Sequence, residues 1–274
     1  MPELPEVETI VRGLDPILRG RQISGYQLFS RKAWRQPDFT CLENLCHKIV
    51  QRVWRRGKFI LLSPTWGPTL IFHLKMTGRL VWVPRTTPHP KHLVFILNFR
   101  NSREELRFID TRKFGYISCR PTEEVISGEA PELAGLGPEP LEIDLEQLQT
   151  ILKGRKGRIK SLLLNQQVIA GIGNIYADEI LFRAGIHPLR PAHTLEPEKV
   201  QLLWQTMRDI LQEAIKKRGT SFRDYRDAAN RAGNYQQLLQ VYGREGKPCP
   251  HCGQPLQRRR IGGRSAHFCP RCQK

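Results

Sequence analysis

The sequence predicts an α+β multidomain protein. Short apolar and β-branched runs separated by turn residues fill positions 20–120, and helical periodicity replaces them from Ile143 onward. Four of the seven cysteines lie within the last 26 residues. We therefore expect a β-sandwich or barrel-like layer, then a helical region, then a small metal-binding module.

The N-terminal part, 1–120, is expected to form one domain with a helix ahead of its strands. Residues 1–13 indicate a helix, because Pro5 is tolerated in a first turn and Leu4, Val7, Ile10 and Val11 recur at helical spacing. Strands are expected at 48–54, 59–63, 69–74, 80–83, 93–99 and 106–109.

The second half changes character after a Pro-, Gly- and Glu-rich stretch, 121–142, which is typical of a linker. A helical region, 143–236, is expected to hold helices at 145–152, from 159, at 174–184 and at 196–217. Its polar end, 219–236, predicts a mobile loop. A short strand at 238–242 would open the last domain, 237–274.

The charge balance points to a polyanionic partner. Lys and Arg number 44 against 26 Asp and Glu, a formal net charge of +18. Nucleic acid is the first candidate and an anionic membrane surface the second. No apolar run approaches the roughly 18–20 residues of a membrane span, and the acidic N-terminus is unlike a signal peptide. We expect a cytoplasmic protein with no membrane partner.

The C-terminal cysteines form two C-x2-C pairs separated by sixteen residues. This spacing predicts one structural Zn²⁺ ion with a closed four-thiolate shell, on a β-hairpin that turns at Gly262 and Gly263. His251 and His267 could replace a ligand but are expected on the hairpin surface. The predicted ligands are Cys249, Cys252, Cys269 and Cys272.

The remaining cysteines, Cys41, Cys46 and Cys119, receive no role. An odd total in a chain without a secretion signal argues against a disulfide framework.

A glycine turn precedes the helix expected at 174–184. Gly171 and Gly173 would allow a phosphate to approach the backbone, and Asn174 could cap the helix or donate to the phosphate. A plain turn with a capping Asn explains the pattern equally well. Nearby basic residues, among them Lys160, favour the phosphate.

The N-terminus offers a second candidate for chemistry. Removal of Met1 would expose the secondary amine of Pro2, a plausible nucleophile toward a sugar carbon, with Glu3 and Glu6 available to move protons. Ordinary helix-start carboxylates are the competing explanation.

Seven motifs in order resemble the bacterial formamidopyrimidine-DNA glycosylases, which are 8-oxoguanine DNA glycosylases with AP lyase activity. They are MPELPEVET at the start, RRGK at 55–58, HLKMTGR at 73–79, DTRKFG at 110–115, LGPEPL at 136–141, AGIGNIYADE at 170–179 and the C-terminal ribbon ending in CPRCQ. The resemblance spans nearly the whole chain. It implies a β-sandwich carrying the N-terminal helix, a helix–two-turns–helix region and a zinc finger.

The resemblance also implies roles. Pro2 would be the nucleophile, Glu3 the general acid/base, Glu6 a further active-site carboxylate, and Lys58 a group near phosphate and sugar. The implied DNA contacts are His73, Met76, Arg112, Phe114, Lys160, Asn174 and Arg264.

Some of these residues have simpler explanations from sequence alone. His73, Met76 and Phe114 could be core residues, and Lys58 a solvated turn lysine. In the implied role, Met76, Arg112 and Phe114 fill the gap that a flipped nucleotide leaves in the duplex.

The expected substrate is double-stranded DNA with oxidised purines or abasic sites, bound by a monomer. The strand would be cut by β,δ-elimination through a Pro2 Schiff base. Two alternatives remain: an endonuclease VIII-type enzyme for oxidised pyrimidines, and a non-enzymatic zinc-ribbon DNA-binding protein. Four basic groups would line one DNA-binding cleft: Arg55–Lys58, Arg112–Lys113, Lys153–Lys160 and Arg258–Arg271.

Overall fold

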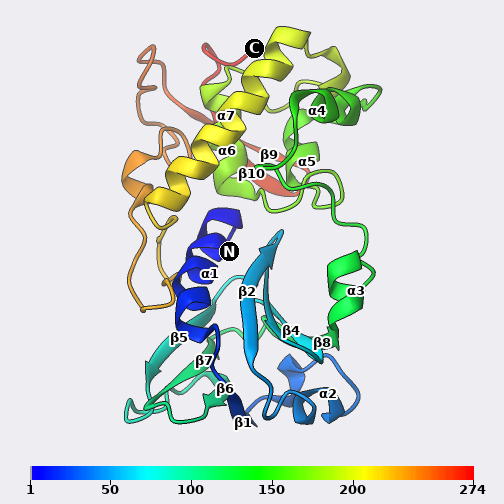
Figure 1. Ribbon diagram of the computed structural model, residues 1–274. Helices are drawn as coiled ribbons and strands as arrows, with labels where there is room; N and C mark the ends of the chain where they lie inside the picture. The colour runs from blue at the N-terminus through cyan, green and yellow to red at the C-terminus, as the bar shows by residue number, and fades with distance from the viewer. Residues whose placement is uncertain (1) are drawn as a thin grey trace. The chain divides into compact units, whose positions relative to one another are not determined.

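The computed structural model describes residues 2–274 and divides them into two compact units (Figure 1). The first contains residues up to Ala134 together with Lys217–Gln236, and the second contains Gly135–Lys216 and Gln237–Lys274. Met1, whose removal was expected, lies outside the described residues. None of the helices within residues 2–274 is long and apolar enough to cross a membrane.

Two four-stranded antiparallel sheets build the first unit. One has the order β1-β6-β7-β5 and the other β2-β3-β4-β8. The first sheet comprises β1 (Ile23–Leu28), β6 (Leu93–Phe99), β7 (Glu104–Asp110) and β5 (Gly78–Pro84). The second comprises β2 (Val50–Arg56), β3 (Phe59–Pro64), β4 (Pro68–His73) and β8 (Tyr116–Pro121).

The two sheets share one apolar core, so the expected sandwich is present. The ring of Phe72 on β4 packs 6.2 Å from Phe95 on β6 and 6.1 Å from Phe108 on β7, between ring centroids. Helix α1 (Leu4–Leu18) packs on β2 and buries Val7, Ile10 and other apolar residues in the same core. The periodicity predicted a helix at 1–13, so its start was placed three residues too early and its end five residues too early.

Short helices complete the first unit. They are η1 (Arg31–Ala33), α2 (Thr40–Glu43) and α3 (Thr122–Ser127). The expected linker 121–142 is therefore not one structural piece, since α3 belongs to the first unit and residues from Gly135 belong to the second.

The loop 219–236 also differs from the expected organisation, because it belongs to the first unit instead of the helical region. It has no helix or strand before Tyr235, but backbone bonds hold it. Trp82 N on β5 donates to Ala228 O at 2.9 Å, and Tyr235 N donates to Gly219 O at 3.0 Å.

Helices and a hairpin build the second unit. The helices are α4 (Leu145–Leu152), α5 (Ile159–Leu164), α6 (Asn174–Arg183), η2 (Ala192–Thr194) and α7 (Pro197–Lys216). The hairpin pairs β9 (Gln257–Ile261) with β10 (Arg264–Phe268). Helix α6 packs against α5, α7 and β10, so the ribbon and helices share one unit.

The strand predicted at 238–242 is wrong. The short helix η3 (Tyr235–Leu238) ends there, and the next backbone N–H groups, of Gln240, Val241 and Tyr242, donate to the carboxylate of Glu179. A side chain thus takes the donors that a neighbouring strand would have used.

Candidate active site and DNA-binding residues

The N-terminus of α1 presents the predicted nucleophile and its neighbouring acids. Pro2 and Glu3 precede the helix and are buried, as is Glu6 in its first turn. Glu6 Oε2 accepts from Glu3 N at 2.8 Å, a bond that fixes the chain where it enters the helix. The amine of Pro2 would lie at the positive end of the α1 dipole, which disfavours its protonated form.

Glu6 connects this helix start to the loop 219–236. Its Oε1 accepts from Thr220 N at 2.6 Å, and Tyr225 Oη donates to Glu6 O at 3.3 Å. Gly219 adopts φ +74°, and a Cβ there would lie 2.6 Å from Glu6 Oε1. The carboxylate of Glu6 therefore holds backbone in place, which suits a positioning role.

Lys58 lies in the turn between β2 and β3, where Gly57 adopts φ +55°. Only 6% of Lys58 is exposed, so it is not a solvated turn lysine. Arg55 anchors the turn, because its Nε contacts Glu8 Oε2 on α1 at 3.0 Å and its Nη1 donates to Gly57 O. Burial raises the pKa of Glu8, but hydrogen bonds from Arg12 and Arg55 hold it below its ordinary value.

His73 ends β4, opposite Phe59 in the register, and is buried. Its ring stacks on Tyr116, and Nδ1 accepts from Lys75 N at 3.0 Å. This bond puts the proton of the neutral ring on Nε2. Burial, followed by the charges of Lys75 and Lys58, lowers the pKa of His73 to about 3. The ring is thus a neutral donor.

Met76, Arg112 and Phe114 form an exposed cluster, although two of them read as core residues from sequence alone. Met76 is 47% exposed and Phe114 is 54% exposed. The Arg112 guanidinium lies 4.7 Å from the Phe114 ring centroid, and its Nη1 lies 3.1 Å from Met76 Sδ. Two turns meet here and present a thioether, a cation and an aromatic ring to solvent.

Asp110 organises both turns, and the sequence reading missed it. Its buried carboxylate accepts from Thr77 Oγ1 beside Met76, from Arg112 N at 3.1 Å and from Gly115 N at 2.7 Å. Its position at the start of the DTRKFG motif was the available signal.

In the second unit, Asn174 is the first residue of α6 and follows the glycine turn. Its Oδ1 is buried and has no hydrogen-bond partner among the described residues. Such an atom is rare in folded proteins, and because a phosphate offers only acceptors, it would bind Asn174 Nδ2 and not this oxygen. Gln166, also missed from sequence, shapes the turn by accepting from Gly171 N and donating to Ile172 O.

Lys160 differs from its expected role as a DNA contact. It is fully buried on α5, and its Nζ lies 2.5 Å from Asp178 Oδ1 and 2.6 Å from Ser265 O. A phosphate contact needs a surface ammonium, so we assign Lys160 to holding the ribbon instead. Arg264, one residue before Ser265, is exposed.

His267 is not a surface residue as expected. It is buried, and both its backbone N and its ring Nδ1 lie within 3.0 Å of Asp178 Oδ2. Arg258, Arg259 and Arg260 along β9 are exposed, so the hairpin does present a basic surface.

The four C-terminal cysteines form a structural zinc site. Their sulfur atoms all lie within 4.8 Å of one another, with Cys249 to Cys272 at 3.9 Å and Cys252 to Cys269 at 3.5 Å. Tetrahedral Zn–S bonds of about 2.3 Å require sulfur separations of about 3.8 Å. The donor set therefore fits one zinc ion with no open coordination position.

Comparison with known proteins matches three family models along the chain. The formamidopyrimidine-DNA glycosylase N-terminal domain matches residues 1–117, the H2TH domain of the same enzymes matches 136–225, and the zinc finger found in FPG and IleRS matches 246–274. The formamidopyrimidine-DNA glycosylase of Pelotomaculum thermopropionicum is 46% identical over 277 residues, covering 100% of this chain and 99% of that protein.

The chain belongs to the formamidopyrimidine-DNA glycosylase family.

Solved structures of this glycosylase family have the same fold. A Lactococcus lactis FPG mutant in complex with Fapy-dG containing DNA has a TM-score of 0.92 at 34% identity, with 100% of both chains covered. A MutM complex with carbocyclic 8-oxo-G containing DNA has a TM-score of 0.91 at 35% identity, also over both whole chains. Residues 165–173 connect helices α5 and α6 within the range that the H2TH model matches.

The neutral His73 gives this glycosylase a testable acid sensitivity. Below pH 6.5 the unfolded chain protonates this histidine and the folded chain does not, so stability falls as the pH drops from 6.5 toward 3. Substituting His73→Gln should reduce the slope of unfolding free energy against pH by about 1 kcal/mol per pH unit between pH 4 and 6. Urea unfolding followed by tryptophan fluorescence measures this slope.

The matched control is His193→Gln, at an exposed histidine. Equal slopes in the wild type and the His73 variant would contradict a neutral His73.

Proposed function

We propose that the protein excises oxidised purines, 8-oxoguanine and formamidopyrimidines, from double-stranded DNA and then cuts the strand at the abasic site. The observation that carries the proposal is Pro2 at the start of α1, next to the buried carboxylates Glu3 and Glu6. The relatives' names and the lesions in the solved complexes support the same substrate class. The enzyme would act as a monomer on nucleoid DNA in the bacterial cytosol.

The covalent step would use the neutral amine of Pro2. The amine attacks the anomeric carbon of the damaged nucleotide, the C1′–N bond breaks, and the base leaves with a proton. Ring opening gives an iminium ion, which makes the neighbouring C–H acidic. Loss of that proton expels the 3′ phosphate, and a second elimination expels the 5′ phosphate. Glu3 is the proposed proton carrier, and Lys58 the cation near phosphate and sugar.

The Met76–Arg112–Phe114 cluster would replace the flipped nucleotide in the stack. A thioether and an aromatic ring can fill the gap, while the Arg112 guanidinium offers only donors. The Watson–Crick edge of an orphaned cytosine offers two acceptors, O2 and N3. This match favours lesions opposite cytosine, and therefore oxidised guanine over oxidised pyrimidines.

The remaining predicted contacts would bind the sugar–phosphate backbone of the DNA. Asn174, Arg264 and the neutral Nε2–H of His73 are proposed to hold phosphates beside the lesion. Zinc would take no part in the chemistry, and its proposed role is to shape the hairpin that presents Arg264.

Borohydride trapping on an 8-oxoguanine·cytosine duplex tests the proposal. We expect a covalent protein–DNA complex whose cross-link maps to the N-terminal peptide by mass spectrometry. A thymine glycol duplex tests the endonuclease VIII alternative in parallel. Tight binding to abasic DNA with no trapped complex would instead identify a non-enzymatic binding protein.

Asp110 should determine how well the Met76–Arg112–Phe114 cluster fits into the gap that the flipped nucleotide leaves in the duplex. Asp110→Ala leaves two buried donors, Thr77 Oγ1 and Gly115 N, and the partly buried Arg112 N without their carboxylate, and should destabilise the fold by about 2–4 kcal/mol. Misplacing the two turns should slow excision by about 100-fold and weaken discrimination between cytosine and adenine opposite the lesion. Single-turnover kinetics on the two duplexes, with urea unfolding, measure these effects.

Phe114→Ala is the control, because it removes the inserting aromatic ring and keeps the hydrogen bonds that the Asp110 carboxylate accepts. Wild-type rates and discrimination in the Asp110 variant would show that the turns keep their shape without it.

A further inference from the structure

A disulfide joins Cys41 and Cys119, two residues 78 positions apart that received no role from the sequence. Cys41 lies on α2 and Cys119 on β8, with their Cα atoms 6.0 Å apart. This bond was not foreseen from the sequence, where the odd cysteine count argued against a disulfide framework. Cys46 is a free thiol.

The disulfide joins a short helical segment to the edge strand of a sheet. Helix α2 has only four residues and no side-chain cap, so it cannot be stable alone. β8 is the edge strand of its sheet, and the segment runs beside it. Arg35 N donates to Ile117 O at 2.9 Å, and Gln36 Nε2 donates to Cys119 O at 2.6 Å. The covalent bond is the strongest link in this contact.

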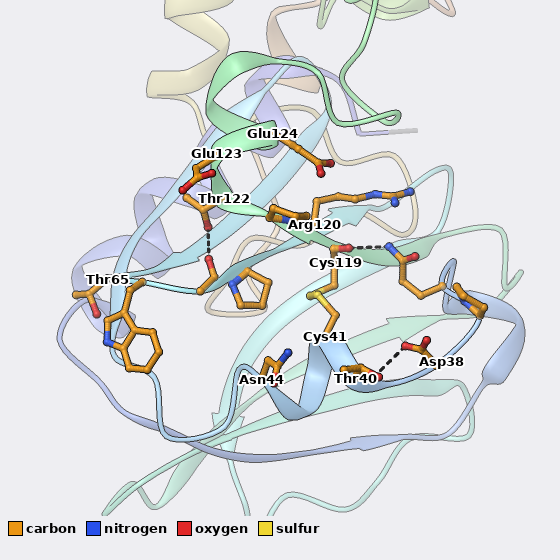
Figure 2. A pocket seen from close by; sticks show the side chains of 16 residues that line it. Asp38, Thr40, Cys41, Asn44, Thr65, Cys119, Arg120, Thr122, Glu123 and Glu124 are labelled. Atoms are coloured by element: carbon orange, nitrogen blue, oxygen red, sulfur yellow. Dashed lines mark hydrogen bonds between the residues drawn. A yellow bond between two sulfur atoms is a disulfide. The ribbon is translucent and has the colours of Figure 1, made fainter.

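A cavity of about 790 Å³ opens beside the disulfide, and both half-cystines line it (Figure 2). The side chains of Asp38, Glu123 and Trp66 lie around the same cavity. Cys119 is 3% exposed, whereas Cys41 is partly exposed. Cys41 is therefore the more exposed half-cystine, and we take its sulfur as the one that an entering thiol attacks.

We propose that Cys41–Cys119 is a reversible thiol–disulfide site that a small dithiol reaches through this cavity. The dithiol's thiolate attacks Cys41 Sγ, the Cys41–Cys119 bond breaks, and Cys119 leaves as a thiolate that takes up a proton. The dithiol's second sulfur then attacks the mixed disulfide and releases Cys41 as a thiol. The protein gains two electrons and two protons, and the dithiol becomes a cyclic disulfide.

Reduction would loosen the α2 segment and leave the rest of the sandwich covalently unchanged. An intact bond closes a loop of 78 residues and so restricts the unfolded chain, which makes the oxidised form more resistant to heat. Cys46 should take no part: its Sγ lies 3.8 Å from Leu42 O, and burial, then Glu43, raises its pKa. The site is independent of the proposed glycosylase chemistry.

The test uses the full-length zinc-loaded protein and dithiothreitol in native buffer. Pulse alkylation with peptide mass spectrometry should find Cys41 and Cys119 protected before treatment and alkylated together afterwards. Their rate of reduction should rise linearly with dithiothreitol concentration, as direct access through the cavity requires. Protection that is absent from the untreated protein, or reduction that needs denaturant, would overturn the proposal.

Thermal melting gives the second readout. Dithiothreitol should lower the Tm of the wild type and of the control Cys46→Ser by about 5–10 °C. The double variant Cys41→Ser/Cys119→Ser should melt like the reduced wild type and not respond. It keeps all four zinc ligands, so an equal Tm loss in the double variant would assign the effect to zinc removal and overturn the proposal.

Discussion

Blocking the amine of Pro2 should abolish borohydride trapping on the 8-oxoguanine duplex, and Pro2→Gly should suppress it at least about 100-fold. An acylated nitrogen has no lone pair available for the sugar carbon. Glycine keeps a primary amine but loses the ring that fixes the nitrogen ahead of α1. Retained binding to abasic DNA would separate lost chemistry from lost folding.

The matched control is Arg19→Gln, at an exposed residue that directly follows α1 and contacts Asp15 instead of the N-terminus. It should trap normally. If trapping stayed efficient both after blocking the amine and in Pro2→Gly, Pro2 would not be the nucleophile, and a lysine amine would have to take that role.

The sequence predicted elements well where periodicity and burial agree. The strand at 93–99 matches β6, and the helix at 145–152 matches α4, because each has a strong apolar pattern and clear turn residues. The zinc ligands were also predictable, since both pairs are local in sequence. Met76 and Phe114 are exposed, as the family resemblance implied. Their apolar character alone favoured buried core positions.

Long-range partners could not be predicted. Nothing local to Cys41 identifies Cys119 as its partner 78 residues away. The same applies to Glu179, whose carboxylate takes the backbone donors of 240–242 and cancels the expected strand. Loop 219–236 looked like part of the helical region, since Glu6 on α1, its anchor, lies over 200 residues earlier.

Lys160 shows most clearly why long-range partners could not be predicted. The sequence indicated a DNA contact, whereas in the structure its buried ammonium pairs with Asp178. Its ammonium and the Asp178 carboxylate are both almost fully buried, and they link α5 and α6 to β10 through Ser265 and His267. Removing one partner leaves a buried charge, so Asp178→Ala should destabilise the protein by about 3–5 kcal/mol. Lys160→Met should also destabilise it. The double variant Lys160→Met/Asp178→Ala should lose less than the sum, by about 2 kcal/mol.

The salt dependence of DNA binding separates this role from a phosphate contact. Each neutralised phosphate contributes about 0.9 to the slope of log K against log salt. Arg264→Met, at an exposed residue beside the buried pair, should reduce the slope by about one. Lys160→Met should weaken binding to abasic DNA and leave the slope unchanged, because its charge is already neutralised inside the fold. If Lys160→Met instead reduced the slope by about one and left the stability unchanged, Lys160 would be a contact to a DNA phosphate.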